Sequence, residues 1–263
     1  VVSIFDDDLL NVPENSHAFG YYVSSSDRAC CREAVALSDI VLLSVPELQK
    51  IYAGQGGNLC QELFPIPFIP ERAAYDAGFQ EWTSGPAILG FAGGESSKAY
   101  TEGILIPALQ ELQRRGVDFI LESMGLRFSD SCGFPVARIP YDAEFKKYRR
   151  TVLSRRWTVG LAPMADSPFH RCKHYNKLLE YGAMLIPGVY SNLLPYTLAV
   201  RDGENGILSG NSPSEWADSI ERLLKSPVLR KTIALNALEF LCKNNSPELA
   251  ASFLWSKLRP LLA

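Results

Sequence analysis

The sequence predicts an α/β protein that contains a Rossmann-like, doubly wound parallel sheet and a partial second Rossmann-like unit. Short apolar strand patterns alternate with helical patterns almost throughout the 263 residues, as in parallel sheets joined by crossover helices. Turns rich in glycine and proline separate these patterns. The composition, 47% apolar and 21% charged residues, is that of an ordinary globular protein with a sizeable core.

Residues 1–84 are expected to form the partial unit, because they contain too few strands for a complete doubly wound sheet. A turn-rich stretch, Glu81–Pro86, separates this unit from the rest of the chain. The expected elements are strands at Val1–Phe5 and Asp39–Leu43, helices at Asp27–Ser38 and from Pro46, and a proline-rich exit at Leu63–Phe68.

Residues 85–242 are expected to form the complete unit, and the helix in residues 243–263 is expected to pack back toward the first unit. Serine followed by proline at Ser226 and Ser246 marks two helix starts. The predicted strands are Ala87–Ala92, Val117–Leu121, Val136–Ile139, Thr158–Ala162 and Ile186–Tyr190, and the predicted helices run up to about Arg115, over Tyr141–Leu153, from Ser167 and from Pro213.

Charge, apolar stretches and cysteine spacing narrow the classes of protein to which this chain could belong. The net charge of −3 gives no overall basic field that would attract nucleic acid. No apolar stretch approaches the roughly 20 residues of a transmembrane helix. Six cysteines without zinc-ligand spacing favour free thiols and a cytoplasmic location. The chain begins on an apolar run without an initiator Met or a signal peptide, so we expect a piece of a longer protein.

The segment that follows the fourth predicted strand carries the strongest functional signal. If Ser167 caps a helix that Pro168 opens, Arg171 and Lys173 lie in its first turns. Cations are unfavourable there by roughly 0.3–1 kcal/mol each, because the N-terminus of a helix is already positive. A bound anion would offset this cost, and the ends of parallel strands are where ligands bind. The segment therefore predicts a phosphate site.

Two further charged residues follow along the same predicted helix. Lys177 is one turn beyond Lys173, so that the two form a like-charge pair, and Glu180 follows three residues later. The Glu180 carboxylate would accept hydrogen bonds from a ribose diol. The alternative is a solvated basic face on which Glu180 makes an ordinary surface salt bridge. The phosphate-site interpretation predicts that Lys173→Ala weakens binding of a nucleoside diphosphate.

The same segment carries a family resemblance. Leu178–Ala183, with the sequence LLEYGA, and Pro187 resemble the donor-site signature of GT-B retaining glycosyltransferases, especially glycosyltransferase family 4. The resemblance covers most of the chain. Its other parts are Trp157–Pro163 (WTVGLAP), Asp202–Leu208 (DGENGIL), Phe5–Leu9 (FDDDL) and Asp39–Leu48 (DIVLLSVPEL).

The resemblance implies transfer of a sugar from a nucleotide-diphosphate-sugar donor to an unknown glycan, lipid or protein acceptor, with retention and without a catalytic metal or other cofactor. Glu180 would bind the donor ribose, while Arg171 and Lys173 would neutralise the diphosphate leaving group. The other expected donor contacts are Gly93, Gly94, Glu95, Ser96 and Lys98 after the first strand of the second unit, Ser123 and Met124 after its second strand, Asp166 and Lys177 near the predicted helix start, and Asn192 after the fifth strand.

Some positions depart from the family pattern. Cys172 stands where the family often has a first Glu, Gly94 stands where an Arg is common, and Lys98 only approximates the position of a Lys. Two alternatives therefore stay open: a nucleotide-sugar epimerase of GT-B fold, and a non-catalytic nucleotide-sugar-binding or scaffold module. An incomplete acceptor half would also leave this piece inactive even if the longer protein is an enzyme.

Weaker patterns have simpler explanations. The segments at Gly93 and Ser123 could equally be plain turns, and the first lacks the GxGxxG spacing of a dinucleotide site. The acidic run 6–8 (DDD) is similar to the DxD metal cluster of GT-A enzymes, but it follows a strand as a turn would, so no metal site is predicted. His17 is expected to be a solvated loop residue.

Overall fold

The computed structural model describes residues 1–16, 18–53, 60–69 and 78–261, and His17 lies outside these residues. The chain divides into two compact units. The first comprises Val1–Phe68, Asp166–Tyr175 and Lys243–Ala263, and the second comprises Ile69–Ala165 and Asn176–Cys242. Residues 78–84 thus group with the second unit, and Asp166–Tyr175 with the first.

The first unit is built on a three-stranded parallel sheet in the order β1-β2-β3. The serine at position 24 starts its main helix, because its side chain accepts from the backbone of Asp27 in a complete capping box. The elements are β1 (Val2–Phe5), α1 (Phe19–Tyr22), α2 (Ser25–Ala36), β2 (Ile40–Leu43), α3 (Pro46–Tyr52), β3 (Cys60–Leu63), α7 (Pro168–Arg171), α11 (Pro247–Leu258) and η3 (Arg259–Leu261).

Both faces of β2 are buried, because its four residues are apolar throughout. On one face, Val41 and Leu43 pack in a cluster with Val35 of α2 and Leu48 of α3. On the other face, Ile40 and Leu42 pack with residues of α11 and with Phe64. The strands, the two helices and the terminal helix expected from the sequence are therefore present in this unit.

The second unit contains a six-stranded sheet in which every pairing is parallel, in the order β6-β5-β4-β7-β8-β9. The chain enters at β4 in the middle, winds outward through β5 and β6, then returns to β7 and winds the other way. The predicted doubly wound class is confirmed, with its switch point between β4 and β7. The strands are β4 (Ala87–Ala92), β5 (Phe119–Met124), β6 (Val136–Ile139), β7 (Val159–Ala162), β8 (Gly188–Ser191) and β9 (Ile207–Ser209).

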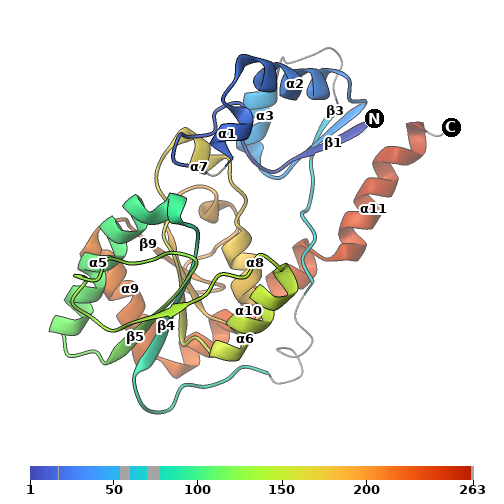
Figure 1. Ribbon diagram of the computed structural model, residues 1–263. Coiled ribbons are helices and arrows are strands. Elements are labelled where there is room, and N and C mark those ends of the chain that lie inside the picture. Colours follow the sequence, from blue (N-terminus) through green and yellow to red (C-terminus); the bar gives the residue numbers. More distant parts are fainter. Residues whose placement is uncertain (17, 54–59, 70–77, 262–263) are drawn as a thin grey trace. The chain divides into compact units, whose positions relative to one another are not determined.

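Helices cover both faces of this sheet, with α5 and α9 on one side and α6 and α8 on the other (Figure 1). Glycine in the strands makes room for aromatic rings on the α8 side: a Cβ at Gly160 would lie 2.6 Å from the ring of Tyr181. The helices are η1 (Glu95–Ser97), α5 (Lys98–Arg114), α6 (Phe145–Arg155), α8 (Asn176–Ala183), η2 (Tyr196–Leu198), α9 (Pro213–Lys225) and α10 (Pro227–Asn244). Among the described residues, no helix has the length and apolar character needed to cross a membrane.

One predicted helix is wrong. Ser167 does cap a helix, since its Oγ accepts from the backbone N–H of His170, but that helix (α7) ends at Arg171. A second helix, α8, begins at Asn176. The break coincides with burial of Cys172 in the core of the first unit, whereas α8 belongs to the second. Lys173 therefore lies between two helices, and it does not form an i,i+4 pair with Lys177.

Candidate functional site

A cavity of about 300 Å³ lies in the second unit where β4, β5 and β6 end. This edge of the sheet is where open α/β folds bind ligands, and the volume is at the lower end of the roughly 300–1,000 Å³ typical of small-molecule sites. The lining residues are Ala92, Gly93, Gly94, Met124, Tyr141, Asp142, Ala143, Phe145, Tyr148, Lys177 and Glu180. Five of them, Gly93, Gly94, Met124, Lys177 and Glu180, are donor contacts expected from the sequence.

Charged side chains reach the cavity from α8. Lys177 Nζ lies 2.6 Å from Glu180 Oε2 and 3.0 Å from the hydroxyl of Tyr148, and both charged side chains are largely buried. Burial lowers the pKa of Lys177, but the charge and hydrogen bond of Glu180 and the nearby Tyr181 and Tyr196 together outweigh it, so the pKa lies above the usual lysine value. The site therefore holds a lysinium and a carboxylate in direct contact.

Two exposed aromatic rings line the cavity. Tyr141 and Phe145 are 68% and 53% exposed, and both line the cavity. Exposed rings on a cavity wall are suited to stacking against a nucleobase. Sequence reasoning missed them because it started the helix at Tyr141, whereas α6 begins at Phe145. The available signal was their place directly after a predicted strand, Val136–Ile139.

Glycine lets the loop after β4 run along the cavity wall. Gly93 donates its N–H to the carbonyl oxygen of Met124 at 3.0 Å, which joins the ends of β4 and β5. The loop leads through η1 into α5, so the cavity lies beside the N-terminal end of a helical segment, where the macrodipole is positive. Backbone groups and a helix end of this kind suit a phosphate.

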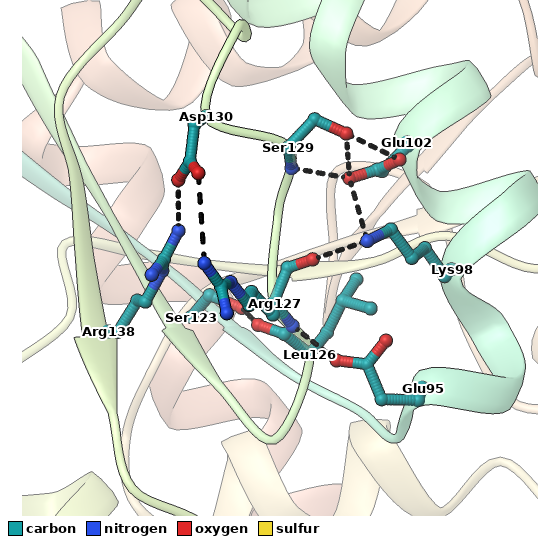
Figure 2. Close-up of polar contacts among 9 residues, drawn as sticks. All are labelled: Glu95, Lys98, Glu102, Ser123, Leu126, Arg127, Ser129, Asp130 and Arg138. Atoms are coloured by element: carbon teal, nitrogen blue, oxygen red, sulfur yellow. Dashed lines mark hydrogen bonds and ion pairs between the residues drawn. The ribbon is translucent and has the colours of Figure 1, made fainter.

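Other residues expected to contact a donor, on this loop and on β5, make hydrogen bonds within the protein instead. Lys98 Nζ donates to the carbonyl oxygen of Arg127 at 2.9 Å, and Glu95 accepts from the Arg127 backbone N–H at 2.6 Å (Figure 2). Ser123 Oγ donates to the Leu126 carbonyl at 2.8 Å. These bonds fold the loop after β5 against the start of α5. Lys98, Glu95 and Ser123 would have to leave these partners to reach a ligand, and with Ser96 they do not line the cavity.

Arg171, Lys173 and Asp166 belong to the first unit, where their charges pair locally. Arg171 Nε donates to Asp166 Oδ1 at 2.7 Å. Lys173 Nζ lies 3.1 Å from Asp7 Oδ1 and 4.5 Å from the centre of the Phe169 ring. These pairs explain the accumulation of cations without a bound anion. The roles toward a diphosphate that the resemblance implies for Arg171 and Lys173 stay predictions.

The first unit also accounts for Cys172 and the acidic run. Cys172 is 3% exposed in the apolar cluster around Phe5 and Val35. Burial and nearby carboxylates raise the pKa of its thiol to about 12, so it stays neutral. Asp8 accepts from Leu10 N and from the Asn11 amide, as a turn would require. Among the residues that the structure describes, no three His, Cys, Asp or Glu side chains gather into a possible metal site.

Comparison with solved structures gives the fold. Sucrose-phosphate synthase from Thermosynechococcus elongatus matches 99% of this chain over 67% of its own length, with 15% identity and a TM-score of 0.66. HepE from Anabaena, solved with UDP and glucose, matches 98% of this chain over 71% of its own, with 17% identity and a TM-score of 0.66. The pneumococcal O-GlcNAc transferase GtfA, solved with UDP and GlcNAc, matches 99% of this chain over 52% of its own length, with 13% identity and a TM-score of 0.60.

The chain has the GT-B glycosyltransferase fold. Neither the protein-family models nor the curated proteins give a match, so this similarity rests on structure alone. Membership of family 4, which the sequence motifs suggested, stays a prediction.

Within this GT-B fold, the DGENG motif forms a turn held by hydrogen bonds of its own side chains. Asp202 Oδ1 accepts from Leu208 N at 2.9 Å, and the buried Asn205 side chain bonds the backbone of Arg201 and Ala199. The motif therefore shapes the entry to β9, a short strand that the sequence analysis did not predict. Asn192, exposed after β8, does not line the cavity.

Proposed function

We propose that this protein is a glycosyltransferase and that the cavity of its second unit binds the nucleotide part of a nucleotide-diphosphate-sugar donor. The observation that carries the proposal is the position of Glu180. Glu180 lines a cavity at the ends of β4, β5 and β6, together with exposed aromatic rings and a glycine loop. A nucleotide needs those three kinds of contact: an acceptor for the ribose diol, a stacking surface for the base and backbone N–H groups for phosphate.

The neighbouring structures support a uridine nucleotide. HepE has been solved with UDP and glucose and also with UDP-glucose, and GtfA with UDP and GlcNAc. UDP-sugars are therefore the first donors to test. The proposed acceptor is a hydroxyl of a glycan, lipid or protein.

The chemistry would be transfer of the sugar from the diphosphate to an acceptor hydroxyl. The bond between the anomeric carbon and the diphosphate oxygen breaks, and negative charge grows on the leaving nucleoside diphosphate. A bond to the acceptor oxygen forms, and the proton of the acceptor hydroxyl passes to the leaving diphosphate. The positive end of η1 and α5 beside Gly93 and Gly94 would stabilise that charge. By its resemblance to family 4, the reaction would retain the anomeric configuration and need no metal. NMR of the product anomer, and activity measured in a chelator, test these two points.

A thermal-shift screen against nucleoside diphosphates and their sugars tests the proposal. A ligand at 100 times its dissociation constant stabilises a protein by roughly 2.7 kcal/mol, so binding raises the unfolding temperature measurably. We expect the rise with one base and not with the others, and release of free sugar or its transfer when the matching donor is supplied. A chain that shifts with no nucleotide would contradict the proposal.

A second candidate is a nucleotide-sugar-binding protein without transfer activity. The neutral, buried thiol of Cys172 favours it, since a carboxylate often occupies that position in the resembled family and a buried thiol cannot replace it in binding the sugar. The screen separates the two candidates: the binding protein would shift with nucleotide-sugars without releasing or transferring sugar.

A further inference from the structure

Three side chains that line the cavity form a closed hydrogen-bonded triangle. Glu180 Oε2 accepts from the Tyr148 hydroxyl at 2.5 Å and from Lys177 Nζ at 2.6 Å, and Lys177 Nζ also lies 3.0 Å from the Tyr148 oxygen. Tyr148 comes from α6, and the other two come from α8. All three line the cavity, and Tyr148 is 8% exposed.

The directions of the three bonds are fixed by protonation. Burial and the charge of Glu180 raise the pKa of Tyr148 well above the usual phenol value, so the phenol keeps its hydrogen. A carboxylate can only accept, and a lysinium can only donate. Tyr148 therefore donates to Glu180 and accepts from Lys177, and no other assignment satisfies the triangle.

In this arrangement one oxygen of the Glu180 carboxylate accepts both hydrogen bonds, and the other oxygen accepts neither. Both bonds to Glu180 end on Oε2, and among the described residues Oε1 makes no hydrogen bond within the protein. A rotation of the carboxylate would break both bonds at once. Oε1 is thus held as an acceptor next to the cavity that Glu180 lines.

The triangle also compensates the charge of Glu180. A bare carboxylate beside a nucleoside diphosphate would repel it, and two unit charges 4 Å apart interact by about 4 kcal/mol at an effective dielectric constant of 20. The lysinium of Lys177 in direct contact makes the group neutral. The carboxylate can then accept hydrogen bonds from the ribose hydroxyls without repelling the phosphates.

We propose that Tyr148 and Lys177 are positioning residues that hold Glu180 Oε2, so that Oε1 is presented to the donor's ribose diol. The inference rests on the proposed function, because it names how the same site recognises its ligand. Neither residue needs to touch the ribose.

The first test compares Tyr148→Phe with wild type for binding of UDP and of 2′,3′-dideoxy-UDP by calorimetry. We expect Tyr148→Phe to weaken UDP binding by about five- to tenfold, the effect of one hydrogen bond, and to leave dideoxy-UDP binding unchanged. Tyr190→Phe is the matched control, since the Tyr190 hydroxyl is buried in the same unit and does not line the cavity. Equal weakening of both nucleotides, or no weakening of UDP, would overturn the role of Tyr148.

The second test is a double-mutant cycle between Lys177→Met and Glu180→Gln. If Lys177 acts by compensating Glu180, Lys177→Met weakens UDP binding by about fivefold in wild type and has no effect once Glu180 is Gln. The same loss in both backgrounds would mean that Lys177 contacts the phosphates directly and would overturn its positioning role. Failure of the wild type to bind any nucleoside diphosphate would instead sink the proposed function, so the two failures are distinguishable.

Discussion

Gly93 and Met124 are joined by a backbone hydrogen bond of 3.0 Å, from the N–H of the first to the carbonyl oxygen of the second. The bond brings the loop after β4 against the loop after β5, and both residues line the cavity. The next residue, Gly125, has a φ of +87°, and a Cβ there would lie 2.6 Å from the Gly93 oxygen. The contact that builds this wall therefore requires a glycine at position 125.

Gly125→Ala should lower the free energy of unfolding by about 1–3 kcal/mol and weaken UDP binding, because the added methyl strains the backbone and pushes the Gly93 loop away. Gly116→Ala is the matched control: its φ of +78° gives a similar backbone penalty, but nothing lies within 4 Å of its Cβ. Urea unfolding and calorimetry on both variants measure the difference. Equal losses of stability and unchanged UDP binding would contradict the steric explanation.

The buried carboxylate of Glu122 depends on Arg155. It accepts from Arg155 Nε at 2.9 Å and from Trp157 Nε1 at 2.8 Å, and its side chain is 6% exposed. Arg155→Met removes the charge that compensates it and should cost about 2–4 kcal/mol of stability. Arg114→Met, whose side chain is 73% exposed in a pair with Glu111, should cost less than about 0.5 kcal/mol. Similar values for both variants in chemical denaturation would refute this role.

Tyr181 of α8 and Tyr190 of β8 are buried neighbours, and loss of the hydroxyl should change the stability of the protein in opposite directions at the two positions. Tyr181 donates to the Leu161 carbonyl at 2.9 Å, so Tyr181→Phe should cost about 1 kcal/mol. The Tyr190 hydroxyl is buried without a hydrogen-bond partner among the described residues, so Tyr190→Phe should raise stability by about 1 kcal/mol. Thermal unfolding of the two variants gives the signs, and a loss at both positions would show that Tyr190 has a partner.

His170 should make stability depend on pH. Burial, and then the charge of Lys173, lower its pKa below the usual value of 6.5. The unfolded chain then binds a proton more readily than the folded one, so this contribution is fully present above pH 6.5 and is lost as the pH falls through the folded pKa. Urea unfolding between pH 7.5 and 5 should show the free energy of unfolding falling with pH. His170→Gln should reduce the slope of that dependence on pH. An unchanged slope in that variant would assign the effect to other groups.

Local signals in the sequence predicted most of the fold, because they depend on nearby residues. Ser212 and Ser246 each accept from a backbone N–H three residues on and precede a proline, and α9 and α11 begin there as expected. The apolar run Ala87–Ala92 forms the predicted strand, since a central strand of a parallel sheet is buried on both faces.

Errors occurred where a distant partner decides the structure. The helix expected to continue past Arg171 ends there, and Cys172 packs among residues such as Phe5 and Val35. No pattern within the segment gives that partner. The short strand β9 was not predicted for a similar reason, since only the pairing of Ile207–Ser209 with β8 makes this segment a strand.

Part of the candidate site was predictable. Met124, at the carboxyl end of β5, and Lys177 and Glu180, on α8, line the cavity, and their contact with a donor stays a prediction. Ser123, one residue earlier on β5, bonds Leu126 and does not line the cavity, as the alternation of side chains along a strand explains. Tyr148 could not have been assigned from sequence, because it bonds Glu180 of another helix, 32 positions further along the chain.

The most direct test of the donor-site assignment is calorimetric titration of UDP into the wild-type chain, Glu180→Ala and the control Glu204→Ala, whose side chain is 65% exposed. Loss of hydrogen bonds to a charged group costs about 1.5–3 kcal/mol, so Glu180→Ala should bind UDP roughly 10- to 100-fold more weakly than the other two. Equal affinity in all three proteins, or no binding of any nucleoside diphosphate to the wild type, would contradict the assignment.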